Sequence, residues 1–196
     1  MVAVAVAAGA LGLAAGWVLS IGGQPTTGAP PVAAVMRPKI VGEFELLDTR
    51  GKRVRWADLN GRWQLVFFGF THCPEACPTT LTNASRALAD PGLDGHYLRV
   101  LFISVDPGRD TPEVIRKYVG NFGPRVIGLT GDPAGIASAA AAFGVFFEKM
   151  PAMADGEYMV NHTATVFLLG PTDEILETIS YGATAPEIAD AVKRHL

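Results

Sequence analysis

At 196 residues and 20.7 kDa, the chain is long enough for one globular domain with a substantial core and a further segment at one end. Its 16 basic and 19 acidic side chains give a net charge of −3, and lysine and arginine form no run. This balance argues against nucleic acid as a partner, since nucleic-acid-binding proteins gather positive charge to meet the phosphates.

The N-terminal segment carries no charged residue before Arg37. Residues 1–22 are almost wholly apolar, long enough to cross a hydrocarbon core of about 30 Å, and lack the regularly spaced polar positions of a surface helix. We predict a transmembrane anchor or an export signal there, and favour the uncleaved anchor because no basic residue precedes the run. Residues 23–36, rich in Gly, Pro and Thr, are predicted to be a flexible linker, so the folded domain is expected over residues 37–196.

The domain is predicted to begin with a β-hairpin over residues 44–59, which turns at 49–52. A later helix is expected to begin at Asp110 as N-cap, with Pro112 in its first turn and Glu113 closing a capping box. Apolar runs and helical spacing predict the other elements. These are strands at 64–70, 97–105, 126–130, 157–169 and 174–181, and helices at 78–89, 132–143 and 185–196.

This order of elements places a β–α–β unit early and an antiparallel pair with a closing helix late. It predicts an α/β fold, a thioredoxin-like domain with an N-terminal β-hairpin and an insertion after the central β–α–β unit. One transmembrane helix is expected to precede the domain. No internal repeat is apparent in the sequence.

Both cysteines lie in residues 69–81, GFTHCPEACPTTL, and each is followed by a proline. Proline disfavours helical backbone at the residue before it, so Cys73 and Cys77 are expected in extended or turn conformations rather than on one helix face. Pro78 suits the first position of a helix, which places Cys77 at the N-cap. The helix dipole should then stabilise a thiolate, most strongly at Cys77.

Three interpretations of the cysteine pair fit this geometry. A structural disulfide suits an exported protein, but it would close a very small loop and stabilise the fold little through chain entropy. A dithiol catalyst needs a nucleophilic and a resolving cysteine, usually in C-x-x-C spacing, whereas this loop is wider. A metal site can use that width, because two thiolates and one imidazole suit Cu(I) or Cu(II).

The chain contains four histidines from which a third ligand could come. His96 and His195 are expected to be solvent-exposed. His72 is expected to order the loop beside Cys73, although it stays an alternative ligand. His162 begins an apolar strand in the late half of the domain, where thioredoxin-like folds bring a loop beside the cysteines. A histidine at the start of a strand is often only packed, but the cysteine pair makes His162 the favoured ligand.

Three methionines, Met150, Met153 and Met159, precede His162 closely. Their thioethers could hold Cu(I) transiently, but methionine in a loop more often only packs. In a regular strand over residues 158–164, Met159 would point away from the face that carries His162. The methionines are therefore a weaker candidate than the cysteines and the histidine.

Four ordered motifs resemble those of the SCO/SenC family of copper proteins, which are required to assemble the copper centre of cytochrome c oxidase. The motifs are GFTHCPEACPTTL at 69–81, SVDPGRDTP at 104–112, GLTG at 128–131 and YMVNH at 158–162. The resemblance implies a thioredoxin-like domain, tethered to a membrane, that binds one copper through Cys73, Cys77 and His162. Asn161 stands where the family often has aspartate, which would make the site less negative.

The resemblance implies a metallochaperone that gives copper to the oxidase subunit carrying the dinuclear copper site. The alternative is a thiol-disulfide oxidoreductase that reduces the cysteines of that subunit, and the same dithiol could serve both functions. A peroxiredoxin-type peroxidase is disfavoured, because its Thr-x-x-Cys pattern would need threonine where Pro74 stands. Without copper, Cys73 and Cys77 are expected to oxidise to an intramolecular disulfide that does not bind Cu(I). Expected partners are the oxidase subunit, a thiol reductant and other copper chaperones.

The predicted location follows from the resemblance, against one opposing signal. Arg37 and Lys39 follow the apolar run and no basic residue precedes it, which by the positive-inside rule would place the domain in the cytoplasm. SCO/SenC domains lie outside the bacterial plasma membrane or in the mitochondrial intermembrane space, and an Arg/Ser-rich transit peptide is not evident. We therefore predict a single-pass protein of the bacterial plasma membrane, with its domain facing the periplasm or the extracytoplasmic side.

Overall fold

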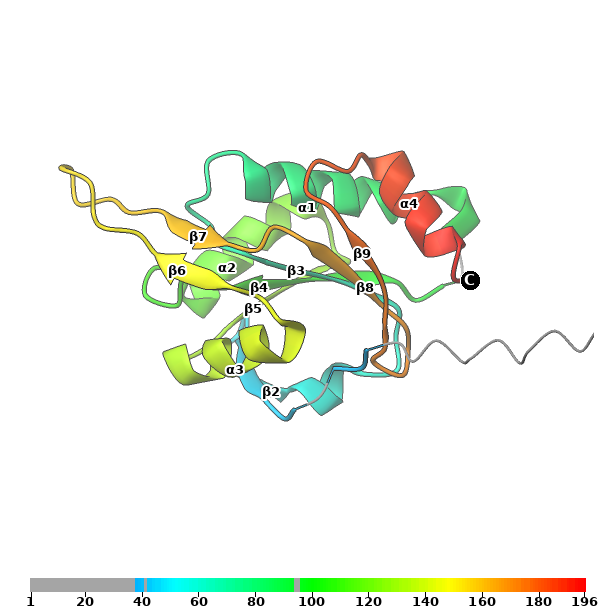
Figure 1. Cartoon of the computed structure of the whole chain (residues 1–196), viewed down its shortest axis with the longest axis horizontal. Helices are drawn as coiled ribbons and strands as arrows, with labels where there is room; N and C mark the ends of the chain where they lie inside the picture. Colours follow the sequence, from blue (N-terminus) through cyan, green and yellow to red (C-terminus); the bar gives the residue numbers. More distant parts are fainter. Residues whose placement is uncertain (1–37, 41, 94–95) are drawn as a thin grey trace, which may run out of the picture. The chain divides into compact units, whose positions relative to one another are not determined.

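A computed structural model describes residues 38–40, 42–93 and 96–196 (Figure 1). The predicted anchor and linker, residues 1–22 and 23–36, lie outside these residues. No helix within the described ranges is long and apolar enough to cross a membrane. The structure therefore concerns the predicted domain alone.

The secondary structure follows the predicted alternation of strands and helices (Figure 1). The strands are β1 (Glu45–Asp48), β2 (Arg53–Arg55), β3 (Gln64–Gly69), β4 (Arg99–Ser104), β5 (Val126–Thr130), β6 (Phe147–Lys149), β7 (Val160–His162), β8 (Val166–Leu169) and β9 (Ile175–Ile179). The α-helices are α1 (Ala76–Ala87), α2 (Pro112–Val119), α3 (Pro133–Phe143) and α4 (Ala185–Lys193). Short 3-10 helices are η1 (Trp56–Leu59), η2 (Pro91–Leu93) and η3 (Gly120–Phe122). The predicted N-terminal hairpin is confirmed by the antiparallel pairing of β1 with β2.

The main sheet has the strand order β2-β1-β5-β4-β3-β8-β9. At its centre β3, β4 and β5 are parallel, because α1 and α2 return the chain to the same end of the sheet between them. The β8–β9 pair is antiparallel and is followed by α4. Together with the β3–α1–β4 unit, it forms the thioredoxin-like α/β arrangement that the sequence predicts. β6 and β7 form a separate two-stranded sheet.

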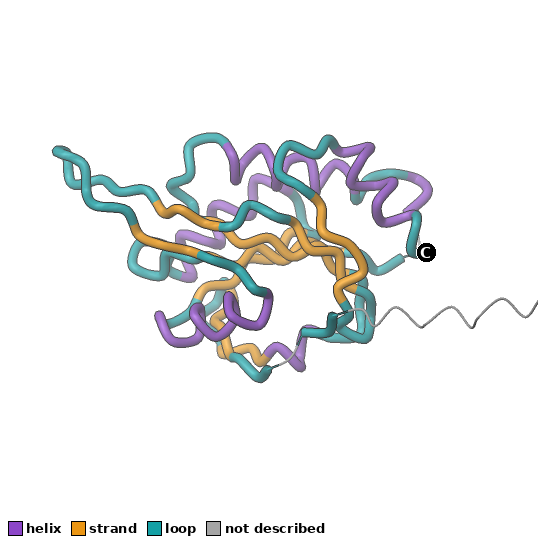
Figure 2. Tube along the Cα trace, in the orientation of Figure 1, coloured by secondary structure: helices purple, strands orange, loops and turns teal. Residues whose placement is uncertain are grey.

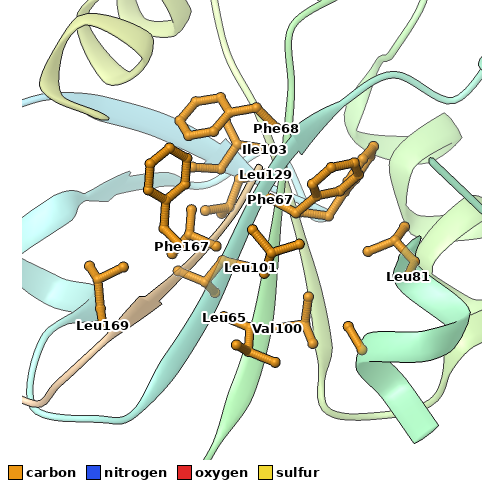
Figure 3. Close-up of a cluster of buried hydrophobic side chains, with 14 of the residues drawn as sticks. Leu65, Phe67, Phe68, Leu81, Val100, Leu101, Ile103, Leu129, Phe167 and Leu169 are labelled. Carbon is orange, nitrogen blue, oxygen red and sulfur yellow. The ribbon is translucent and has the colours of Figure 1, made fainter. Parts of the chain in front are cut away.

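The hydrophobic core occupies both faces of the main sheet, because β3 and β4 are buried along almost their whole length. On the face covered by α1 and α2, the ring centroids of Phe102 and Tyr118 lie 5.4 Å apart. On the opposite face, Phe143 of α3 packs against Phe68 with ring centroids 5.3 Å apart. Figure 3 shows part of this core, with side chains from β3, β4, β5 and β8 together with Leu81 of α1.

The first described residues are joined to the turn between β8 and β9. Backbone hydrogen bonds link Ile40 to Asp173 at 3.0 Å and Ile175 to Pro38 at 2.8 Å. Because β8 runs antiparallel to β3, this turn lies at the end of the sheet where β3 begins.

The prediction of one strand over residues 157–169 is wrong, because the chain forms β7 and β8 there, separated by residues 163–165. β7 pairs with β6, with His162 opposite Phe147, whereas β8 pairs with β3 in the main sheet. The change of partner breaks the strand. The β6–β7 hairpin (residues 146–163) projects away from the main sheet, and its tip consists of loop residues (Figure 2).

The predicted start of the second helix also differs from the structure. The N-cap of α2 is Thr111, whose hydroxyl accepts a hydrogen bond from the Val114 N–H, and not Asp110. Asp110 is fully buried, and its carboxylate accepts hydrogen bonds from Thr71 and Ser104. A long-range role therefore replaces the local capping role that the sequence pattern indicates.

Candidate functional site

The cysteine loop, residues 70–77, connects the end of β3 to the first turn of α1. The N-cap of α1 is Glu75, so the prediction of Cys77 as N-cap and Pro78 as first helical residue is wrong. Proline in the first turn removes no helical hydrogen bond, because the N–H groups there have no partner within the helix. The helix can therefore begin earlier. Cys73 lies outside α1, as predicted.

Cys77 belongs to the first turn of α1, and its side chain is fully buried beside the end of β3. A Cβ atom at Gly69 would lie 2.8 Å from the Sγ atom of Cys77 and 2.9 Å from the Phe102 ring. A side chain at Gly69 would therefore displace the sulfur. The glycine at the start of the GFTHC motif makes room for the buried thiol, a role that the sequence pattern alone does not indicate.

The imidazole of His162 lies beside this buried sulfur, with Nε2 3.7 Å from the Sγ atom of Cys77. On the other side of the ring, Nδ1 lies 3.0 Å from the carbonyl oxygen of Thr163. A carbonyl oxygen can only accept, so Nδ1 carries the proton and the Nε2 lone pair is directed towards Cys77. The rings of Phe67 and Phe70 stand edge-on to the imidazole and restrict its rotation.

The two thiols differ in their tendency to ionise. Cys73 is half-buried, and its pKa is lowered to about 5 by a hydrogen bond from the Cys77 thiol and by backbone N–H groups at the start of α1. The N–H of Cys77 lies 3.3 Å from the sulfur of Cys73. The same thiol hydrogen bond raises the pKa of Cys77, and burial raises it further. The prediction that the helix N-terminus stabilises a thiolate mainly at Cys77 is therefore wrong, because Cys73 receives these donors.

The other three histidines lie in different surroundings from His162. Nδ1 of His72 lies 3.1 Å from the Thr71 hydroxyl, so His72 takes part in the loop, as predicted. His96 is exposed, also as predicted. The prediction that His195 is exposed is wrong, because its Nε2 lies 3.0 Å from a carboxylate oxygen of Glu177 and its side chain is only 16% exposed.

The outer face of the hairpin carries the methionines and Asn161. Met150 and Met159 are opposite each other, with a backbone hydrogen bond of 2.9 Å, and both side chains are exposed. Because successive residues of a strand alternate between faces, Met159 and Asn161 lie on the face opposite to that of His162. The exposed Asn161, singled out above for its lost charge, thus faces away from the imidazole side.

The structure brings the three predicted ligands together as two adjoining pairs centred on Cys77. Cys77 contacts His162 through its sulfur and Cys73 through its backbone N–H, and both thiols are free. Among the described residues, no three His, Cys, Asp or Glu side chains lie close enough together to bind a metal ion without rearrangement.

Comparison with known proteins relates the chain to one family of sequences. A family model described as SCO1/SenC matches residues 33–196. "Protein SCO2 homolog, mitochondrial" of Bos taurus is 39% identical over 159 residues, which cover 79% of this chain and 59% of that protein. "Protein SCO1 homolog, mitochondrial" of Homo sapiens is 36% identical over 162 residues, which cover 82% of this chain and 54% of that protein. The chain thus spans little more than half of the length of these relatives.

Solved structures share the fold. ScoI of Arabidopsis thaliana with copper bound has a TM-score of 0.74 and 35% identity, covering 79% of this chain and 96% of that one. ScoI of Bradyrhizobium japonicum with copper bound has a TM-score of 0.71 and 40% identity, covering 80% and 99%. BsSco, described as a Sco family cytochrome c oxidase assembly protein with a disulfide switch, has a TM-score of 0.60 and 25% identity, covering 81% and 94%. These similarities confirm the mixed α/β, thioredoxin-like fold.

Proposed function

Because the chain belongs to the SCO1/SenC family, we propose that it is a membrane-tethered copper metallochaperone that assists assembly of the dinuclear copper centre of cytochrome c oxidase. The observation that carries this proposal is the 3.7 Å contact between Nε2 of His162 and the sulfur of Cys77, next to the acidic thiol of Cys73. Two thiols and one imidazole form a donor set that suits copper.

Cys73, Cys77 and His162 are the proposed ligands of one copper ion, Cu(I) or Cu(II). The hydrogen bond from Nδ1 of His162 to Thr163 leaves Nε2 as the donor atom. Cys73 is ready as a thiolate, whereas Cys77 must release its proton on binding, because its pKa is raised. Copper is cargo in this proposal, and the burial of Cys77 keeps water from one of its donors.

The copper-bound ScoI structures support copper as the cargo, and the description of BsSco supports the oxidase as its destination. The proposed partners are the oxidase subunit that carries the dinuclear copper site, a thiol reductant and other copper chaperones. We place the protein in the bacterial plasma membrane, crossed once by residues 1–22, with a linker at 23–36 and the domain at 37–196 on the periplasmic side. The uncharged apolar sequence of residues 1–22 supports this anchor.

The difference in pKa between the two thiols favours a second candidate function, a thiol-disulfide oxidoreductase acting on the oxidase subunit. Such a protein needs a reactive thiolate and a second cysteine within reach, and Cys73 with Cys77 meets both needs. In this function the Cys73 thiolate attacks a disulfide of the subunit, and Cys77 then displaces the subunit's sulfur. The subunit gains two thiols, and Cys73 and Cys77 form a disulfide. The disulfide switch described for BsSco supports redox chemistry in a relative.

Copper titration of the reduced full chain in detergent, without oxygen, tests the proposed ligands. We expect one copper per chain, and no binding in the Cys73→Ser, Cys77→Ser double variant, because both soft anionic donors are then missing. A stoichiometry near zero in the unaltered chain, or full affinity in the double variant, would overturn the assignment.

A second experiment separates the two functions. The purified copper-site domain of the oxidase subunit is offered to the chain with its cysteines reduced, and again as a disulfide. A metallochaperone transfers copper to the reduced form, whereas an oxidoreductase converts the disulfide form to dithiol without copper. The matched variant is His162→Ala, which should impair copper transfer and leave thiol exchange intact, since His162 supplies no sulfur.

A further inference from the structure

The loop between β4 and α2, residues 105–111, contacts both the cysteine loop and the β6–β7 hairpin that carries His162. Asp110 in this loop is fully buried, and its carboxylate accepts the backbone N–H of Thr71 at 3.0 Å and the Thr71 hydroxyl at 2.5 Å. The Ser104 hydroxyl donates to the same carboxylate at 2.6 Å. These bonds hold the beginning of the cysteine loop against the main sheet.

Arg109, the neighbour of Asp110, contacts the hairpin instead. Its guanidinium donates to the Glu157 carboxylate at 3.1 Å and to the Tyr158 carbonyl at 2.9 Å, and lies 3.5 Å from the centre of the Tyr158 ring. Asp106 joins the two residues, because it accepts from Arg109 at 2.6 Å and from the Tyr158 hydroxyl at 2.8 Å. Arg109 therefore connects the loop to the hairpin through charge, hydrogen bonds and ring stacking.

Packing beneath the hairpin is incomplete. Within the described residues, β6 and β7 pair with each other and not with the main sheet. A cleft of about 310 Å³ lies between the hairpin, the 105–111 loop and α3, lined among others by Pro107, Ile136 and Val160. Because this space is not filled by side chains, the position of the hairpin depends on the contacts that Arg109 and Asp106 make with Glu157 and Tyr158.

The contacts of Arg109 also relate to the position of the His162 imidazole. His162 follows Tyr158 by four residues, about 13 Å along an extended chain, in the same arm of the hairpin. Arg109 further lies 5.9 Å from the centre of the Phe70 ring, whose centroid is 5.8 Å from that of the imidazole. Two routes, one through the backbone and one through packing, lead from Arg109 to His162.

We propose that Arg109 is a positioning residue for the candidate copper site, which holds the hairpin through Tyr158 and Asp106 so that His162 faces Cys77. Asp110 sets the position of the cysteine side and Arg109 sets that of the histidine side, so one loop determines the separation of the donors. The inference rests on the proposed function, because it concerns the same three ligands.

The test compares Arg109→Gln, His162→Ala and their combination in the full chain in detergent. Copper affinity is measured by competition with a chelator, and the nitrogen ligand by electron paramagnetic resonance of the Cu(II) form. We expect Arg109→Gln to weaken binding about tenfold and to reduce the nitrogen signal. In the His162→Ala background it should cost no further affinity, because the imidazole that it positions is missing.

The matched control is Arg116→Gln. Arg116 is an exposed arginine of α2 in a long ion pair with Glu113, 3.9 Å apart, and its loss should change neither the affinity nor the nitrogen signal. Equal affinity losses from Arg109→Gln with and without His162 would overturn the positioning role.

Hydrogen exchange of the metal-free chain separates this inference from the proposed function. Exchange should rise at amides 147–162 in Arg109→Gln, while β3 and β4 keep their protection. Tyr158→Phe, which removes only the hydroxyl bond to Asp106, should cause a smaller rise and serves as the test if Arg109→Gln does not fold. Unchanged exchange in the hairpin would overturn the inference. If exchange rises in Arg109→Gln but His162→Ala leaves the copper affinity unchanged, the proposed ligand set is overturned. The role of Arg109 in fixing the hairpin would then remain supported.

Discussion

The cysteine loop and the β6–β7 hairpin contribute to the same site in different ways. The cysteine loop is attached to the core at both ends, because Cys77 is fully buried and Asp110 binds the beginning of the loop. The hairpin lies outside the main sheet and brings His162 to Cys77 from a separate two-stranded sheet. The sulfurs thus share the stability of the domain, whereas the imidazole depends on a hairpin held by side-chain contacts from the 105–111 loop.

This difference bears on how a carried ion could be released. A two-stranded hairpin is only marginally stable by itself, and opening it disturbs fewer buried contacts than opening the core. A site divided in this way can withdraw one donor while the other two stay in place. For the proposed metallochaperone, the hairpin is therefore the half of the site that we expect to move when cargo passes to a partner.

Within the cysteine loop, the largest expected contrast is between the two thiols. In the reduced, metal-free chain at pH 7, Cys73 should react with iodoacetamide at least about a thousandfold faster than Cys77, because Cys73 is a half-buried thiolate and Cys77 is a buried thiol. A pKa lowered to about 5 keeps the thiolate above that pH, so the rate at Cys73 should fall only as the pH drops through about 5. Mass spectrometry of the labelled peptides measures both rates, and similar rates would contradict the assignment.

Between the two regions, the histidines give the next contrast. His162→Ala should lower copper affinity about ten- to a hundredfold, because it removes the donor that faces Cys77. His72→Ala should change it less than about threefold, since His72 is bonded to Thr71 in the loop. Competition titration of both variants provides the measurement. Comparable losses would mean that the wrong histidine has been chosen.

Global stability should separate the core from the hairpin. A Cβ atom at Gly128 would lie 2.1 Å from a methyl carbon of Ile115, so Gly128→Ala should lower the free energy of unfolding by about 1–3 kcal/mol. Gly156 at the hairpin tip has a φ of 85° and open space around a Cβ, so Gly156→Ala should strain the turn by about 1–2 kcal/mol and act on the hairpin only. Urea denaturation reports the first effect and amide exchange the second. A lower global midpoint for Gly156→Ala would show that the hairpin unfolds with the core.

The smallest effect is expected on the outer face of the hairpin. The Met153→Ala, Met159→Ala double variant should change copper affinity less than about twofold, because both side chains are exposed and Met159 lies on the face opposite to His162. The same competition titration applies, with His162→Ala as the sensitive reference. A loss of tenfold or more would assign Cu(I) binding to the thioethers.

Most of the fold could be predicted from the sequence, because β3 and β4 are continuous apolar runs and the order of elements is that of a known topology. The failures fall where a tertiary contact overrides a local rule. Asp110 has the sequence context of an N-cap, yet its carboxylate binds Thr71, 39 positions away in the chain. The strand at 157–169 is divided because its two parts pair with different partners.

The candidate site was predicted only in part, for related reasons. The motifs indicate Cys73, Cys77 and His162, but spacing does not show which sulfur receives the N–H groups of α1, so the helix-dipole argument places the thiolate on the wrong cysteine. The contact between Arg109 and Tyr158 joins residues 49 positions apart. No local pattern relates such residues, so their meeting is visible only in the folded chain.

The pairing of Pro38 and Ile40 with the β8–β9 turn determines where the start of the described chain lies relative to the thiols. That turn lies at the end of the sheet where β3 begins, whereas Cys73 and Cys77 follow the other end of this strand. β3 has 6 residues, so about 20 Å separate the two ends. Pro38, near which the described chain begins, therefore lies at the pole of the domain remote from the sulfurs, and a partner can approach the sulfurs without meeting that part of the chain.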